Sequence, residues 1–163
     1  MKLKQILSSI AVGAVLLWTS AANAALYNFS LSGDYSASWQ LDASPAPDIY
    51  SAGDGFILWD VSGNFPGAAL DVVDLVFFHS SGGGGLQIED FYGDTILLSS
   101  DGPQLYTGSE SAPVFKLGTF TLNQFQGSDS YTLTISAVPE PATYGMLLGG
   151  LGLVGVALRR RRA

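Results

Sequence analysis

Tyr27-Asn28-Phe29-Ser30-Leu31-Ser32 is the stretch that decides the fold, because large apolar residues alternate in it with small polar ones. A period of two places the apolar side chains on one face of a β-strand and the polar side chains on the other. The same alternation recurs in residues 35–41 and 131–136. Each of these three segments is therefore predicted to be a strand with one buried and one solvent-facing side.

Shorter apolar runs between these segments extend the β pattern. They span residues 56–61, 72–78, 86–91, 95–98, 114–117 and 119–122. Turn-forming residues separate them, as in 44–48, 82–85 and 99–103, and we expect the four glycines of 82–85 to form a flexible loop with positive φ. No stretch of ten residues between positions 25 and 137 has the helical period. Eight to ten short strands of this kind predict an all-β ectodomain, an antiparallel β-sandwich or a jelly-roll-like fold.

The charge of the central segment excludes one large class of partners. Residues 25–137 hold thirteen Asp or Glu residues against a single basic residue, Lys116, which gives a formal charge of −12. Nucleic-acid binding needs a positive field along the phosphates, so no nucleic acid is expected as a partner. The chain has no cysteine, and this one domain must therefore be stable without disulfides.

The first 24 residues have the three regions of a secretory signal peptide. Lys2 and Lys4 precede an apolar run over residues 10–17, and small residues follow at Ala22 and Ala24. This order predicts export and cleavage after Ala24, so that the mature chain begins at Ala25. The apolar run is shorter than the roughly 20 residues that a membrane span needs.

The last 26 residues form a segment of different character. Val138-Pro139-Glu140-Pro141 is followed by an uncharged stretch at 142–158 and then by the basic residues Arg159, Arg160, Arg161 and Arg162. As a helix, the uncharged stretch would be about 25 Å long, which suffices for a single C-terminal transmembrane helix. Because clustered arginines stay in the cytoplasm and act as a stop-transfer signal, the preceding domain is expected outside. The chain thus divides into a signal peptide (1–24), an acidic β-rich ectodomain (25–137) and a tail (138–163).

The tail resembles the PEP-CTERM sorting signal, which is also catalogued as an ice-binding-protein C-terminal domain. The resemblance rests on Val138-Pro139-Glu140-Pro141, the Gly-rich apolar segment and the terminal arginines. It implies processing by exosortase, a membrane enzyme of Gram-negative bacteria that produce exopolysaccharide. It also implies an inner-membrane intermediate with its ectodomain in the periplasm, followed by transfer to the cell envelope or the extracellular matrix.

The ectodomain resembles a type of domain that often precedes such tails. The resembling stretches are residues 27–30, 61–65, 82–86 and 102–108. This second resemblance implies export and β architecture, and it implies no biochemical activity. Ice binding is not inferred, because the ectodomain lacks a regular repeat of threonine-bearing strands.

Few residues of the ectodomain indicate catalysis. His79 is the only histidine, and the chain has no G-x-S-x-G nucleophile motif, so His79 is predicted to be a polar residue at a strand end. One histidine without cysteine cannot form the usual zinc site. The carboxylates that flank apolar strands are interpreted as solvated turns, with a hydrolase pair or a calcium site of unspecified ligands as alternatives. They are Asp71, Asp74, Glu89, Asp90 and Asp94.

Six aromatic residues would suit a carbohydrate-binding platform if they stood in an exposed row. They are Trp39, Trp59, Phe77, Phe78, Phe91 and Tyr92. Most are expected to face the core, so packing is the preferred interpretation. The sequence therefore predicts a non-enzymatic, exported surface or matrix protein that is sorted by exosortase and has no cofactor. Its ectodomain is expected to be structural or binding. The membrane and exopolysaccharide are expected as further partners. The alternatives are a small polysaccharide-active hydrolase and a calcium- or carbohydrate-binding module carried by the same tail.

Overall fold

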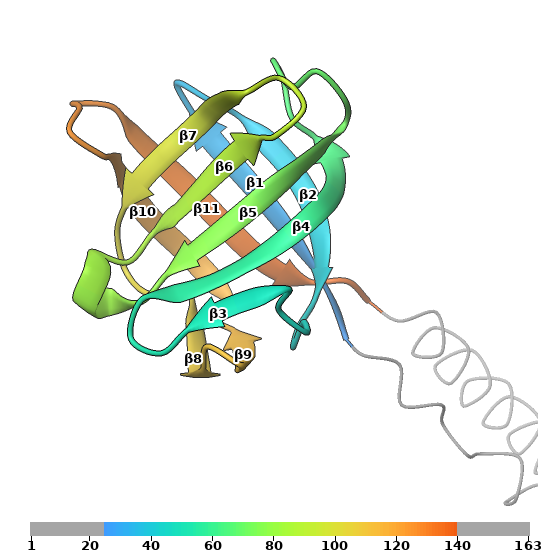
Figure 1. The fold of residues 1–163 in the computed structure, drawn as a ribbon, viewed down its shortest axis with the longest axis vertical. Coiled ribbons are helices and arrows are strands. Elements are labelled where there is room, and N and C mark those ends of the chain that lie inside the picture. Colours follow the sequence, from blue (N-terminus) through green and yellow to red (C-terminus); the bar gives the residue numbers. More distant parts are fainter. Residues whose placement is uncertain (1–24, 140–163) are drawn as a thin grey trace, which may run out of the picture.

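The computed structural model of the chain describes residues 25–139 (Figure 1). These residues form eleven β-strands and one short 3-10 helix, η1 (Ser80–Gly82). The strands are β1 (Leu26–Gly33), β2 (Ala37–Asp42), β3 (Ile49–Ser51), β4 (Gly55–Asn64), β5 (Val72–Phe78), β6 (Leu86–Asp90), β7 (Thr95–Asp101), β8 (Tyr106–Ser109), β9 (Ala112–Phe115), β10 (Gly118–Gln124) and β11 (Ser130–Ala137). The predicted all-β class is confirmed for the part of the chain that the structure describes.

Nine of the strands form one antiparallel sheet in the order β2-β1-β11-β10-β7-β6-β5-β4-β3. A further pairing of β2 with β4 closes this sheet on itself, so that it takes a barrel-like shape with two facing layers (Figure 1). The predicted sandwich also has two facing layers around one core, but here strand pairing joins the layers at both edges. β8 and β9 pair only with each other and lie at one end of the closed sheet (Figure 1).

The closure depends on Gly63, which lies where β2 meets β4. Gly63 pairs with Trp39, and a Cβ atom on Gly63 would lie 2.7 Å from the carbonyl oxygen of Ser38 and 2.9 Å from the Cβ atom of Trp39. Packed atoms do not tolerate such distances. Glycine at this position therefore lets the two strands approach closely enough to pair.

The three alternating segments form strands as predicted. β1 pairs with both β2 and β11, and the apolar residues of all three strands point inward. The total of eleven strands exceeds the predicted eight to ten, because β3 and β8 were not recognised. Both are very short, and β3 is exposed along its whole length, so neither carries an alternating pattern.

One predicted turn is wrong in part, and one predicted loop is found between its strands. Residues 99–101 belong to β7, where the buried Ser100 donates its hydroxyl hydrogen to the carbonyl oxygen of Leu86 at 2.8 Å. The glycines at 83–85 connect β5 to β6 and have positive φ as predicted. Gly84 donates its N–H to the carbonyl of His79 at 3.1 Å, and its Cα packs so closely against the Gly102 carbonyl that a Cβ atom would clash.

Aromatic rings fill the interior of the closed sheet. Phe29 on β1 stacks on Trp39 of β2 with 5.3 Å between ring centroids, and it meets Phe115 of β9 edge-on at 4.9 Å. Phe77 of β5 stacks on Phe56 of β4 at 5.1 Å. Each such pair contributes about 0.5–1.5 kcal/mol beyond the burial of its area. These rings come from five strands, β1, β2, β4, β5 and β9. The aromatic core therefore packs both layers of the sheet against the hairpin formed by β8 and β9.

Several predicted features lie outside the described residues. They are the signal peptide with Ala22 and Ala24, the helix at 142–158, Glu140 and Pro141 of the sorting motif, and Arg159, Arg160, Arg161 and Arg162. Within residues 25–139 there is no helix with the length and apolar character needed to cross a membrane.

Candidate functional site

The sorting motif begins at the point where the domain ends. β11 finishes at Ala137, and the N–H of Val138 still donates a hydrogen bond to the carbonyl oxygen of Leu26 at 2.8 Å. Pro139 has no N–H and cannot continue this pairing. The first residue of the motif, Val138, is therefore still paired with the sheet, without a linker and beside the predicted first residues of the mature chain.

His79 follows β5, as predicted, and caps the 3-10 helix. Its Nδ1 atom accepts a hydrogen bond from the backbone N–H of Ser81 at 3.1 Å and lies 2.7 Å from the Ser81 hydroxyl. That hydroxyl also donates to the carbonyl oxygen of Gly53. Because the backbone N–H already occupies the acceptor nitrogen, this geometry suits a structural cap better than the activation of a serine.

Glu110 lies on the other side of His79, with 3.9 Å between Glu110 Oε1 and His79 Nε2. Hydrogen bonding to its own backbone N–H lowers the pKa of Glu110 most, and the Tyr106 hydroxyl and the nearby His79 lower it further against the opposing effect of burial. Tyr106 donates its hydroxyl hydrogen to Glu110 at 3.2 Å. Burial first, and then the charge of Glu110, raise the pKa of Tyr106 above its ordinary value of 10.0. The Tyr106 hydroxyl therefore keeps its proton and is the donor in its hydrogen bond to Glu110.

The five candidate carboxylates are not gathered into one site. Asp74 of β5 lies opposite Glu89 of β6 on the outer face, whereas Asp90 is buried and accepts a hydrogen bond from the N–H of Ala69 at 2.7 Å. Asp71 precedes β5, and Asp94 lies in the turn before β7 with a φ of 50°. Among residues 25–139 there is no group of three His, Cys, Asp or Glu side chains arranged to hold a metal ion.

The prediction that most of the six aromatic residues face the core is wrong, because only Trp39 and Phe77 do. Trp39 and Phe77 are buried and Phe78 is half-buried. Trp59, Phe91 and Tyr92 retain 47%, 71% and 58% of their accessible surface. These exposed fractions are high for rings of this size, so core packing cannot explain the three residues.

The three exposed rings lie together. With Asp60 and Asp74 they line a surface hollow of about 340 Å³, which we call the aromatic hollow. Trp59 comes from β4, and the other two rings come from the turn between β6 and β7. The rings of Phe91 and Tyr92 meet edge-to-face with 5.8 Å between centroids. The hollow is comparable in size to the smaller ligand pockets of proteins.

A β-bulge places Trp59 at this hollow. Between Leu58 and Val61 the pairing with β5 shifts by one residue, so Trp59 and Asp60 together oppose Asp74. Asp60 has a φ of 52°, and its N–H donates to the Asp74 carboxylate at 3.0 Å. The N–H of Trp59 donates to the Asp48 carboxylate at 2.9 Å. Two carboxylates thus accept the backbone N–H groups of the bulged residues, and bulges of this kind redirect side chains at functional sites.

A tight turn holds the other two rings. Phe91 and Tyr92 follow β6, and the N–H of Asp94 donates to the carbonyl oxygen of Phe91 at 3.4 Å before β7 begins. A Cβ atom on Gly93 would clash with the Asp90 carboxylate, so the turn requires glycine there. The rings therefore project from a short turn fixed at both ends by paired strands.

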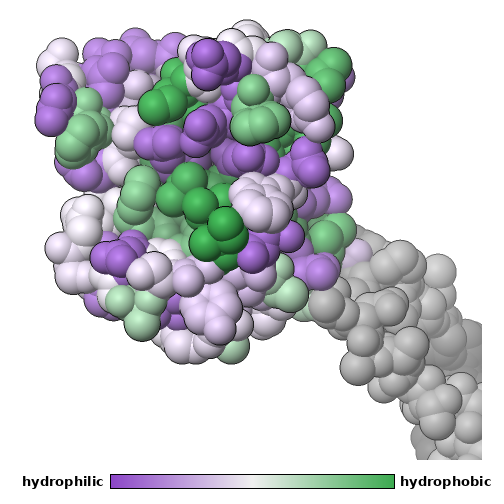
Figure 2. Space-filling view, viewed as in Figure 1, coloured by the Kyte–Doolittle hydropathy of each residue, from purple (hydrophilic) through white to green (hydrophobic). Residues whose placement is uncertain are grey.

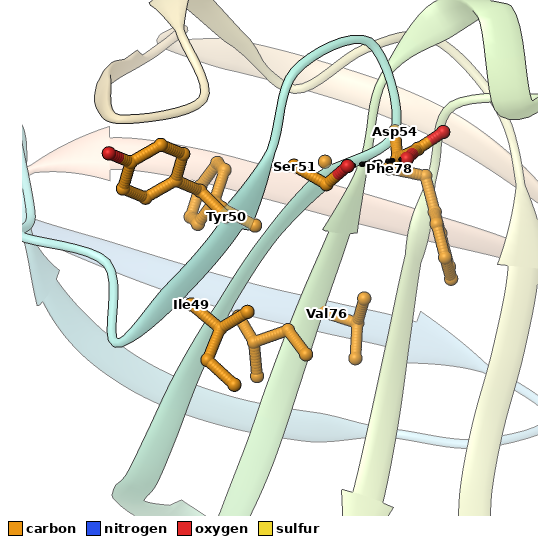
Figure 3. Close-up of a pocket in the computed structure, with 9 residues that line it drawn as sticks. Ile49, Tyr50, Ser51, Asp54, Val76 and Phe78 are labelled. Carbon is orange, nitrogen blue, oxygen red and sulfur yellow. Dashed lines mark hydrogen bonds between the residues drawn. The ribbon is translucent and has the colours of Figure 1, made fainter.

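A second hollow lies on the same face of the molecule. It has a volume of about 160 Å³ and is formed by β3, β4 and β5, and we call it the apolar hollow (Figure 3). Its lining residues are Ile49, Tyr50, Ser51, Asp54, Gly55, Phe56, Ile57, Val76 and Phe78. At one end the Ser51 hydroxyl donates to the Asp54 carboxylate at 2.6 Å (Figure 3). Figure 2 shows hydrophobic residues gathered over β4 and β5 and bordered by hydrophilic ones.

A folded β domain whose last strand leads directly into Val138 and Pro139 has the organisation of a surface protein with a C-terminal sorting signal. The signal matches a known family, because residues 137–162 fit the model of the PEP-CTERM protein-sorting motif. The chain therefore carries this motif, and the resemblance inferred from its sequence is confirmed. The motif implies processing by an exosortase and export to the cell envelope or surface. No curated protein matches the chain. No solved structure matches it either.

Proposed function

We propose that this protein is sorted to the bacterial surface by its tail and that its ectodomain binds, without cleaving, a glycan of the exopolysaccharide matrix. The observation that carries the proposal is the aromatic hollow, in which Trp59, Phe91 and Tyr92 are exposed on structurally defined positions. Exposed aromatic groups that are held rigidly, rather than scattered, mark binding surfaces.

The chemistry of the hollow suits a sugar. Aromatic faces pack against the C–H groups of a sugar ring, and neighbouring carboxylates accept hydrogen bonds from its hydroxyl groups. Asp60 and Asp74 supply such acceptors beside the rings. One oxygen of Asp74 already accepts the Asp60 N–H, so this carboxylate is held in place before a ligand arrives. A rigid acceptor loses little conformational entropy on binding.

The proposal is tested in cells of an exopolysaccharide-producing bacterium that expresses the full-length chain. Trp59→Ala should reduce the fraction of protein that co-purifies with the polysaccharide, because loss of one stacking ring weakens binding by about tenfold. Phe125→Ala is the matched control, since Phe125 is 52% exposed and does not line the hollow. Equal retention of the Trp59→Ala variant and the parent, with both correctly sorted, would refute the proposal.

A further inference from the structure

The two hollows follow one another along a single strand pair. On β5 the outward side chains are Asp74, Val76 and Phe78, which alternate with the inward-facing residues. Asp74 lines the aromatic hollow, whereas Val76 and Phe78 line the apolar hollow. On β4, Ile57 pairs with Val76, and Trp59 lies two residues further on, opposite Asp74. The hollows are therefore neighbours on one continuous face.

The combined surface is elongated along the strands. From Phe78 to Asp74 it extends about 14 Å at roughly 3.4 Å per residue, and the turn that carries Phe91 and Tyr92 lengthens it. Ile49 of β3 pairs with Ile57 and is 47% exposed beside the apolar part, whereas the Tyr50 ring points away from Ile49 and Val76 (Figure 3). A surface of this length is longer than one sugar ring, which favours an extended chain over a monosaccharide.

The charge along this surface is negative. Asp54 lies at one end, and Asp60 and Asp74 lie in the aromatic hollow with Glu89 paired opposite Asp74. The only basic residue among residues 25–139 is Lys116, whose Nζ donates to the carbonyl oxygen of Gln104 at 2.7 Å and lines neither hollow. An acidic polymer would be repelled here, whereas ammonium groups would be attracted by both the carboxylates and the aromatic faces.

We infer that the aromatic and apolar hollows form one extended groove that binds several consecutive units of an amino-sugar polysaccharide with free ammonium groups. This inference rests on the proposed function and specifies the ligand of the same site. The apolar sugar faces pack on Trp59, Ile57 and Val76. The ammonium groups lie against Asp60, Asp74 and the rings of the turn.

The test uses the full-length chain in lipid nanodiscs and isothermal titration calorimetry. The probes are a glucosamine hexamer, a glucosamine dimer and an N-acetylglucosamine hexamer. The glucosamine hexamer should bind about tenfold more tightly than its acetylated counterpart, which corresponds to one exposed cation–π contact plus one exposed ion pair. Raising the salt concentration should reduce this difference because the charges are exposed. Equal or tighter binding of the acetylated hexamer would overturn the inference about charge.

Variants separate the groove from the aromatic hollow alone. Ile49→Ala should weaken binding of the hexamer severalfold and leave binding of the dimer unchanged, because Ile49 lines the apolar hollow and only the longer chain reaches that part. Trp59→Ala should weaken binding of both. If Trp59→Ala has its effect but Ile49→Ala has none and the dimer binds as well as the hexamer, the extended groove is wrong and the proposed function stands. If Trp59→Ala changes nothing, the proposed function itself fails.

Discussion

Val138, the first residue of the sorting motif, donates its N–H to the carbonyl oxygen of Leu26 at 2.8 Å. The two ends of the described domain are thereby held side by side, and Pro139 is the first residue free of the ladder. An enzyme that reads the motif must therefore work close to the folded domain. Processing should depend on the residues of the motif itself rather than on a flexible linker.

Replacing Glu140 by Ala tests the motif. The change leaves the predicted apolar helix and the terminal arginines intact, so membrane insertion should persist while processing is lost. The full-length precursor should accumulate in the membrane fraction, which immunoblotting and mass spectrometry of the C-terminus would detect. A variant that is processed and sorted like the parent would show that the tail acts only as an anchor. Cells without exosortase provide the matched control.

Replacing Arg159, Arg160, Arg161 and Arg162 by Ser should give a different failure. Each arginine costs roughly 2.5 to 3.5 kcal/mol at the bilayer centre, so the cluster resists passage through the membrane. Without it, the tail should slip through and the protein should leave the cell with its C-terminus intact. Mass spectrometry of the medium measures this outcome. Retention of the serine variant in the membrane would contradict a stop-transfer role.

The sequence identified most of the fold because the burial pattern is local. In β1 the inward Phe29 and Leu31 and the outward Ser30 follow from a period of two, and the same holds in β11. Closure of the sheet could not be predicted. It depends on the pairing of Trp39 with Gly63, which are far apart in the chain, and no local pattern encodes that contact.

The aromatic hollow was missed for a related reason. Trp59 lies in a continuous apolar run, where periodicity cannot distinguish inward from outward positions. Its direction is set by the bulge, and the bulge depends on Asp48 and Asp74 from other segments. A usable signal did exist for Phe91 and Tyr92. They precede Gly93 and Asp94, a pair typical of turns, and residues at a hairpin turn are exposed.

The lowered pKa of Glu110 predicts a pH-dependent stability. Because the folded-state pKa lies below the ordinary value of 4.5, ionised Glu110 stabilises the fold above about that pH, and the contribution is lost as pH falls through the folded-state pKa. Glu110→Gln should therefore lower the melting temperature at pH 7 and have a much smaller effect near pH 3. Tyr106→Phe removes one hydrogen bond to Glu110 and should reproduce part of the change. A constant difference between parent and Glu110→Gln at every pH would contradict the assignment.

Phe29→Ala tests the aromatic core. Phe29 is 1% exposed and contacts Trp39, Phe77 and Phe115. Its removal leaves a cavity, and the free energy of unfolding should fall by about 3–5 kcal/mol in urea denaturation. The exposed Phe125 offers the same substitution without a cavity, and Phe125→Ala should change stability by no more than about 0.5 kcal/mol. Similar losses in both variants would mean that Phe29 is not part of a packed core.

The bulge in β4 can be tested by removing one residue. Trp59 and Asp60 together oppose Asp74, and Asp60 holds a φ of 52°. Deleting Asp60 should restore regular pairing and change the direction of the Trp59 ring, so that glycan affinity falls about tenfold while the domain stays folded. Asp60→Gly keeps the extra residue in a conformation that glycine adopts freely, so this variant should keep its melting temperature and lose only the carboxylate's share of binding. If calorimetry shows that the deletion variant binds like the parent, the bulge does not position Trp59 for the ligand.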